Sequence, residues 1–161
     1  MPFNHLLLCW LESATSTSVT QQGKTVNFPR KFTADVVLIF KTDSKEYKEK
    51  WAVNKPVSDY LFYYTNTEDQ DRKVFLVFVE LGGNKADHGV EQLRQTIKTM
   101  RDELKSKRIA GKAQFSALVL YSGGSSPQDL SRQKKEFQEQ YQTILKVKQG
   151  IRADAREEFG I

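Results

Sequence analysis

The sequence has little of what disulfide-stabilised, zinc-binding or membrane-spanning proteins need. Its 161 residues include one cysteine, Cys9, and two histidines. A single cysteine cannot form an internal disulfide, and so few thiol and imidazole ligands argue against a zinc centre. The longest early apolar run, residues 6–11, is far shorter than a membrane span and lacks the basic flank of a secretory signal. We therefore expect a cytoplasmic protein that has no membrane partner.

The excess of positive over negative charge lies entirely in the second half of the chain. Residues 1–80 hold ten basic and ten acidic side chains, whereas residues 81–161 hold fifteen and ten, which accounts for the net charge of +5. The excess is greatest where six basic side chains lie close in sequence: Lys98, Arg101, Lys105, Lys107, Arg108 and Lys112. Such a cluster attracts DNA, because each neutralised phosphate releases a counterion, although it is also typical of a solvated helix end.

Apolar patterning predicts one α/β domain over residues 1–161. Residues 4–14 fit a short helix or a buried strand, and we favour the helix; residues 13–25, rich in Ser, Thr and Gln, are typical of a loop. Runs of β-branched and aromatic residues predict strands at 33–41, 57–65, 73–81, 114–122 and 143–148. We expect the last strand to lie at a sheet edge, because its lysines discourage further pairing.

Two helices are predicted between these strands. Apolar residues three and four apart indicate a long helix from Asp87 to near Gly111. Ser126 followed by Pro127 is a typical helix start, and this second helix is expected to reach about Gln140. The sequence predicts a C-terminal tail over residues 149–161. The predicted order is therefore αβββαβαβ around a central mixed sheet that is flanked by helices.

Two carboxylates lie inside otherwise apolar, strand-forming segments. Asp59 is near the start of one strand and Glu80 near the end of the next, and the short polar connection between them predicts an antiparallel hairpin. Burying a charge is costly unless it is paired, hydrated or bound to a cation. If the two acids share a face, they can bind one Mg²⁺ or Mn²⁺, with the Leu81 carbonyl as a further ligand. The alternative is that they are exposed or paired with a neighbouring lysine.

The segment from Pro56 to Gln92 resembles the restriction-endonuclease-like nucleases. Its strings P-V-S-D-Y-L-F, V-F-V-E-L-G-G and H-G-V-E-Q-L-R-Q-T-I are similar to the PD-(D/E)-x-K signature of that superfamily. The resemblance implies a three-layer fold and a metal-dependent site that hydrolyses phosphodiester bonds in DNA. It also implies that Asp59 and Glu80 are the two acids of the site, and that Gln92 is the glutamine that some members carry on the following helix.

The sequence departs from this signature at the lysine. Gly82 stands two residues after Glu80, where a lysine would stabilise the charge that develops on the phosphate. Lys85, in the loop before the predicted helix, is expected to replace it, and a solvated loop charge is the alternative. The sequence thus predicts a Mg²⁺-dependent DNA endonuclease. The rival hypothesis is a catalytically inactive nuclease-fold module that binds nucleic acid or a protein partner, and the sequence leaves open whether the chain forms a homodimer.

Overall fold

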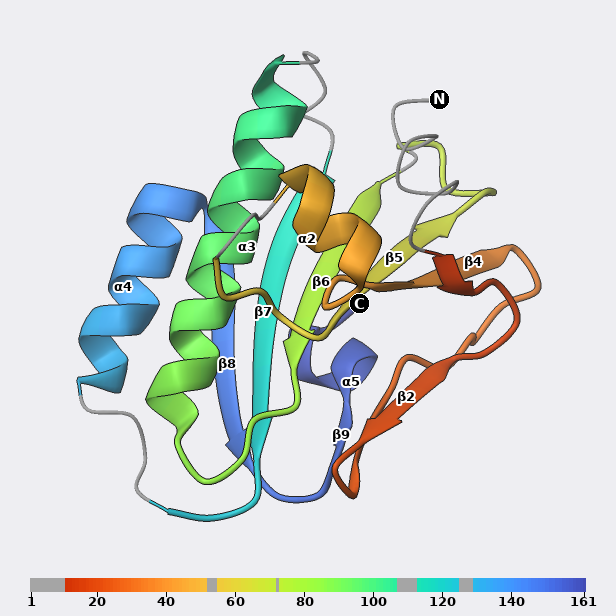
Figure 1. The fold of residues 1–161 in the computed structure, drawn as a ribbon. Coiled ribbons are helices and arrows are strands. Elements are labelled where there is room, and N and C mark those ends of the chain that lie inside the picture. Colours follow the sequence, from red (N-terminus) through yellow and green to blue (C-terminus); the bar gives the residue numbers. More distant parts are fainter. Residues whose placement is uncertain (1–10, 52–54, 72, 107–112, 125–128) are drawn as a thin grey trace.

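The computed structural model in Figure 1 is a mixed α/β fold, and it describes residues 11–51, 55–71, 73–106, 113–124 and 129–161. The strands of its central sheet, in their order across the sheet, are β1 (Leu11–Ser13), β4 (Asp35–Lys41), β5 (Tyr60–Asn66), β6 (Val74–Glu80), β7 (Ala113–Tyr121) and β8 (Thr143–Gln149). A second sheet contains β2 (Ser18–Gln21), β3 (Lys24–Asn27) and β9 (Arg152–Asp154).

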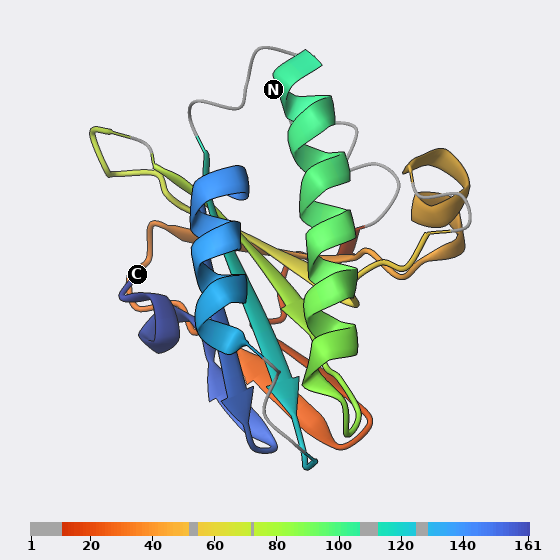
Figure 2. The ribbon, with the colours of Figure 1, turned by 90° about the vertical axis from the view of Figure 1, so that its left-hand side faces the viewer.

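Helices cover one face of the central sheet. The described helices are α2 (Lys45–Trp51), α3 (Ala86–Ser106), α4 (Leu130–Tyr141) and α5 (Ala155–Phe159). Figure 2 shows α3 and α4 side by side across the sheet, where one apolar core forms between the two layers. A second core lies on the opposite face, which is covered by the second sheet together with α5. The predicted mixed sheet with flanking helices is confirmed, and the other face is covered mainly by strands.

The pairing of the strands confirms the predicted hairpin. β4, β5 and β6 pair antiparallel in succession, and β5 faces β6 with Leu61 opposite Phe78. β6, β7 and β8 are parallel, so α3 and α4 are the crossover connections that parallel neighbours require. β8 lies at the edge of the sheet, as its lysines indicated.

The two long helices also agree with the sequence pattern. α3 begins at Ala86, one residue before the predicted start, and its apolar stripe is buried: Val90, Leu93, Ile97, Met100 and Leu104. α4 begins at Leu130, after the left-handed residue Asp129. The predicted cap, Ser126 with Pro127, lies outside the described residues, as does the predicted end of the first helix near Gly111.

Three expectations about the remaining segments are wrong. Residues 11–13 form a strand that pairs with β4, whereas a helix was favoured for 4–14; residues 4–10 lie outside the described part. Residues 18–27 form a hairpin, whereas a loop was expected for residues 13–25. The two turn residues of the hairpin, Gln22 and Gly23, both have positive φ, 50° and 74°. Residues 149–161 are no tail, since they include β9 and α5. In each case long-range pairing or packing orders a segment whose local pattern is weak.

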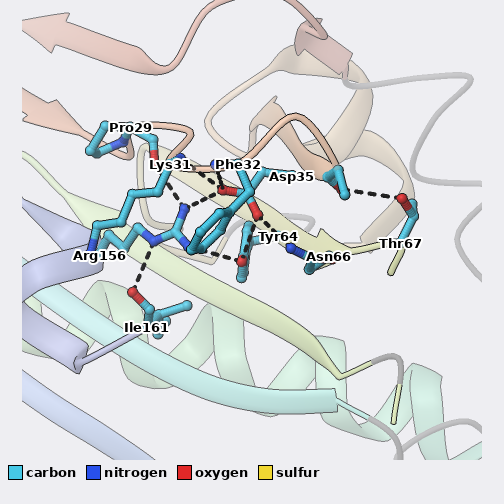
Figure 3. Close-up of polar contacts among 10 residues, drawn as sticks. Pro29, Lys31, Phe32, Asp35, Tyr64, Asn66, Thr67, Arg156 and Ile161 are labelled. Carbon is cyan, nitrogen blue, oxygen red and sulfur yellow. Dashed lines mark hydrogen bonds and ion pairs between the residues drawn. The ribbon is translucent and has the colours of Figure 1, made fainter. Parts of the chain in front are cut away.

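A buried ion pair fixes the C-terminal segment, as Figure 3 shows. The Arg156 guanidinium is 3% exposed and lies 2.6 Å from the Asp35 carboxylate. It also donates hydrogen bonds to the Tyr64 hydroxyl at 3.0 Å and to the carbonyls of Pro29 and Ile161 at 3.1 and 2.9 Å. This one side chain therefore ties the end of the chain to β5 and to the start of β4.

The described helices are all too short or too polar to cross a membrane. The absence of a membrane partner and the cytoplasmic compartment remain predictions.

Candidate functional site

Asp59 and Glu80 meet at one end of the β5–β6 hairpin. Extending the register of Leu61 opposite Phe78 by two residues places Asp59 directly opposite Glu80. Glu80 lies against α3, on the face that carries Phe78, whereas the Asp59 carboxylate contacts Gln21 of the second sheet. Both are buried, with exposed fractions of 6% for Asp59 and 5% for Glu80. The pairing of β5 with β6 thus brings the two acids to the same end of the hairpin, whereas their convergence on one cation stays a prediction.

The Asp59 carboxylate is held by hydrogen bonds to both of its oxygens. The backbone NH of Leu81 donates to Oδ2 at 2.8 Å, and the side-chain amide of Gln21 donates to Oδ1 at 3.0 Å. Burial raises the pKa of Asp59, and these two hydrogen bonds act in the opposite direction. Because a carboxylate oxygen has two lone pairs, each oxygen keeps the capacity to bind a cation.

A chain of hydrogen bonds fixes the backbone before Asp59. Gln92 on α3 donates its amide to the Val57 carbonyl at 2.9 Å, and the Ser58 NH donates to the Thr96 hydroxyl at 2.8 Å. On the other side, the Thr42 NH donates to the Asp59 carbonyl at 3.0 Å. Gln92 therefore orients the segment that carries Asp59, and this is a positioning role.

The Glu80 carboxyl group accepts a hydrogen bond from the Asp59 backbone NH, which acts to lower its pKa. Its Oε2 atom is buried and has no hydrogen-bond partner among the described residues. Burial, and after it the negative charge of Asp59, raise the pKa of Glu80 to about 9. Without a cation, Glu80 therefore holds a proton at neutral pH. Uncompensated buried polar atoms of this kind are rare in folded proteins and are typical of functional sites.

Gly89 on α3 allows the helix to lie directly over Glu80. A Cβ atom at position 89 would lie 2.9 Å from Glu80 Cγ and 3.0 Å from Val119 Cγ1, which is too close for an unshifted structure. A glycine inside a helix costs about 1 kcal/mol relative to alanine. The close contact explains why the helix contains one here, and it confines the Glu80 side chain between α3 and the sheet.

The two acids fit a hard divalent cation. Among the described residues no group of three or more His, Cys, Asp or Glu side chains could hold a metal ion. Mg²⁺, however, is commonly bound through one or two carboxylates, with water and substrate phosphate as its other ligands. Asp59 and Glu80 supply that pair, and the unpartnered Glu80 Oε2 supplies a free ligand atom. Leu81 contacts Asp59 through its NH, and the predicted use of its carbonyl as a ligand stays a prediction.

Asp43 and Lys41 add charge beside the two acids. The negative charge of Asp43 raises the pKa of both Asp59 and Glu80, whereas Lys41 lowers that of Asp59. Both residues line a hollow of about 450 Å³. Lys41 is half-buried at the end of β4, opposite Tyr60. The sequence alone did not identify either residue. Their position near Asp59 depends on the pairing of β4 with β5, which no local pattern reveals.

Positions 82 and 85 differ in their relation to the acids. Gly82 is buried, and a Cβ there would lie 3.9 Å from Val119 Cγ1, an ordinary contact. Since Gly89 approaches the same Val119 atom and Glu80, a side chain at position 82 would start on the Glu80 side of the strand. Lys85 is exposed directly before α3, and among the described residues no hydrogen bond or ion pair joins it to either acid.

Only part of the predicted basic cluster is both described and exposed to solvent. Lys98 is exposed on α3. Arg101 is 8% exposed; its guanidinium stacks 4.0 Å from the centre of the Phe115 ring and donates to the Gln142 carbonyl at 3.2 Å. Arg101 is therefore used within the fold and is not available to a phosphate, which corrects the prediction for this residue. The side chain of Lys105 and all of Lys107, Arg108 and Lys112 lie outside the described part.

No family model, curated protein or solved structure matches this chain. What the site does is therefore inferred from its own residues and their geometry.

Proposed function

We propose that the protein is a restriction-endonuclease-like nuclease that hydrolyses DNA phosphodiester bonds with Mg²⁺ bound by Asp59 and Glu80. The observation that carries this proposal is the pair itself: two buried carboxyl groups opposite each other at a hairpin end, one of them with a buried oxygen that lacks a partner. An isolated buried carboxyl group is destabilising, so its presence favours a ligand that binds it.

The order of the elements supports the same proposal. β4, β5 and β6 form an antiparallel meander, α3 crosses over, and β7 returns parallel to β6. The resemblance implies the order helix, three strands, helix, strand; the last five of these elements occur in that order, whereas residues 11–13 form a strand where the first helix was expected. Glu80 lies at the C-terminal end of β6, and ligands of open α/β sheets commonly bind at the C-terminal ends of parallel strands.

Each side chain has a defined task in the proposed reaction. Asp59 and Glu80 bind the cation, and Glu80 gives up its proton when it does so. Gln92 holds the segment before Asp59 in place through the Val57 carbonyl. A bound divalent cation supplies charge stabilisation to the phosphate and makes a water molecule more acidic for in-line attack. Lys98 is proposed to attract the duplex from its exposed position on α3.

The test is DNA cleavage by variants of the two acids. Supercoiled and linear DNA are incubated with wild type, Asp59→Asn and Glu80→Gln in Mg²⁺ or Mn²⁺. We expect both variants to lose all detectable cleavage, because each removes a charged ligand. Glu68→Gln is the matched control: Glu68 is an exposed acid in the turn of the same hairpin and should be neutral. Cleavage that all three variants retain would show that another site, or a contaminant, cuts the DNA.

Gly82→Lys distinguishes an active site from a degenerate one. The space at position 82 accepts a side chain, so this variant is expected to fold. If wild type is inert and Gly82→Lys cuts DNA, the chain is the inactive nuclease-fold module. If both are inert and Mg²⁺ does not raise the melting temperature of wild type, the nuclease proposal is wrong.

A further inference from the structure

Lys24 is a buried lysine on the hairpin of residues 18–27. It is the first residue of β3 and is only 3% exposed. It shares the buried face of β3 with Val26 and lies opposite Gln21 across the two-residue turn. In Figures 1 and 2 this turn lies at the same end of the molecule as the loop between β6 and α3, which contains Gly82.

Gln21 connects this lysine to the candidate site. Its amide lies 3.0 Å from Asp59 Oδ1, so the inner face of the hairpin reaches the acid pair. Residues directly opposite in an antiparallel pair have Cβ atoms about 5 Å apart and point to the same side. The four-carbon stem of Lys24 therefore starts beside the side chain that contacts Asp59.

Lys24 has no anionic partner within the part of the chain that the structure describes. No ion pair or hydrogen bond of its ammonium group is found among those residues. By contrast, the other buried cations, Arg101 and Arg156, both donate hydrogen bonds within the fold. Lys24 as a whole is buried, but its ammonium nitrogen, unlike Glu80 Oε2, is not among the fully buried atoms without a partner, so a ligand at this end of the molecule can reach it.

We propose that Lys24 binds a non-bridging phosphate oxygen of the substrate beside the acid pair, and so supplies the cation that position 82 lacks. This inference rests on the proposed function, because it requires a phosphodiester at Asp59 and Glu80. An ammonium group in a water-poor site stabilises charge on phosphate far more than one in water does. Lys85, exposed in its loop, offers no such environment. Lys24 is a substrate-binding residue contributed by a segment outside the motif region.

The test separates DNA binding from DNA cleavage. A short fluorescein-labelled DNA duplex is titrated with wild type, Lys24→Met, Lys24→Gln, Lys24→Arg and Lys85→Met, by fluorescence anisotropy in Ca²⁺ and in EDTA, and cleavage is measured in Mg²⁺. Methionine keeps the length of the stem, and thermal unfolding shows whether each variant is folded. We expect both neutral variants to weaken binding in Ca²⁺ about tenfold, the effect of losing one charge-assisted hydrogen bond. Lys24→Arg should retain most of the affinity, and Lys85→Met all of it.

The outcomes distinguish this inference from the proposed function. Cleavage that depends on Asp59 and Glu80 but is unchanged in Lys24→Met overturns the role of Lys24 alone. Duplex binding that depends on Lys24, with no cleavage in any divalent metal, supports Lys24 as a phosphate ligand and overturns the nuclease. Wild type that does not bind the duplex even at low salt overturns both. A merely structural Lys24 would show increased stability in Lys24→Met and unchanged binding.

Discussion

At the scale of one residue, Glu80 illustrates how a buried carboxyl group with an unpartnered oxygen lowers the stability of a fold. Its carboxyl group is buried beneath α3 and next to Asp59, and no hydrogen bond of Oε2 is found among the described residues. The unfolded chain lets the same group ionise at its ordinary pKa, whereas the folded chain does not. Folding therefore binds a proton at neutral pH, and stability must depend on pH through this residue.

We predict that Glu80→Gln stabilises the metal-free protein at neutral and alkaline pH. The folded pKa of Glu80, about 9, lies above the ordinary value of 4.5, so the stability that protonated Glu80 contributes is fully present below pH 4.5 and is lost as the pH rises toward 9. Glutamine does not titrate and escapes this loss. At pH 7 the difference should reach about 1 to 3 kcal/mol in favour of the variant, since each pH unit of this window contributes up to about 1.4 kcal/mol.

Urea denaturation of both proteins in EDTA, from pH 4.5 to 9, measures this difference. The advantage of Glu80→Gln should vanish at the acidic end and grow steadily with pH. Mg²⁺ should then stabilise wild type and leave the variant unchanged. A difference that does not vary with pH would mean that Glu80 ionises normally in the folded protein.

The residues of the site were predictable from sequence to different degrees. Asp59 and Glu80 were identified because a charge inside an apolar strand is conspicuous, and the hairpin register follows from two strand patterns and a short turn. Gln21 was not identified, because its contact with Asp59 depends on how a separate sheet packs on the first. Arg101 was misassigned to the surface for the same reason: its spacing fits a helix face, and only the packing on Phe115 shows that the face is covered.

At the scale of elements, α3 both covers the site and orders it. Its first turns hold Gly89 over Glu80 and Gln92 against the Val57 carbonyl, so the position of the helix sets the position of both acids. This helix was predictable because apolar residues recur three and four positions apart over most of its length. α2 was not predicted, because five of the seven residues 45–51 are charged, and among those whose side chains are described only Tyr47 lies in the core.

We predict that Gly89→Ala separates the helix from the acid pair. The new methyl group would meet Glu80 Cγ at 2.9 Å and Val119 Cγ1 at 3.0 Å, so α3 or Glu80 must move. The gain in helix propensity, about 1 kcal/mol, is offset by overpacking of about 1 to 3 kcal/mol. We expect a net loss of stability of about 1 kcal/mol and a loss of Mg²⁺-dependent stabilisation.

Thermal unfolding of Gly89→Ala with and without Mg²⁺ measures both effects. His88→Ala is the matched control, because His88 is the adjacent, exposed residue on the same turn of α3. If Gly89→Ala responds to Mg²⁺ as wild type does, Glu80 does not bind the ion in the position described here.

The hairpin of residues 18–27 is an element that the local sequence pattern did not predict. Val19 and Val26 face the core opposite each other, and the left-handed residues Gln22 and Gly23 match the twist that a two-residue hairpin turn needs. This signal is present in the sequence but is brief, and the surrounding Ser, Thr and Gln outweigh it. The segment is ordered by its parallel pairing with β9, more than a hundred residues away in the chain.

At the scale of the whole molecule, Arg156 joins the end of the chain to the start of the central sheet. Burial raises the pKa of Asp35, but the Arg156 guanidinium, the NH groups of Lys31 and Phe32 and the Tyr64 hydroxyl outweigh it and hold this pKa well below its ordinary value. Both members of the ion pair are almost fully buried. Removing one partner of such a pair leaves an uncompensated charge inside the protein.

We predict that Arg156→Met lowers the free energy of unfolding at pH 7 by about 3 to 5 kcal/mol. Because the folded pKa of Asp35 is depressed, the contribution of the pair is present above the ordinary Asp pKa and is lost as the pH falls below about 4. The difference between wild type and Arg156→Met should therefore shrink in acid. Urea denaturation between pH 3 and 7 measures it.

The double variant Arg156→Met with Asp35→Asn is the control for this interpretation. It removes both charges and should be more stable than the sum of the two single changes implies. Additive losses would show that the two residues contribute independently.

The pairing of β3 with β9 has a consequence for the biogenesis of the protein. A ribosome releases the acid pair and α3 well before residues 152–154, yet β3, which carries Lys24 and pairs with β2, gains its second neighbour only when those residues arrive. A nascent chain would thus form the hairpin that contacts Asp59 in its paired state only after residues 152–154 have left the ribosome.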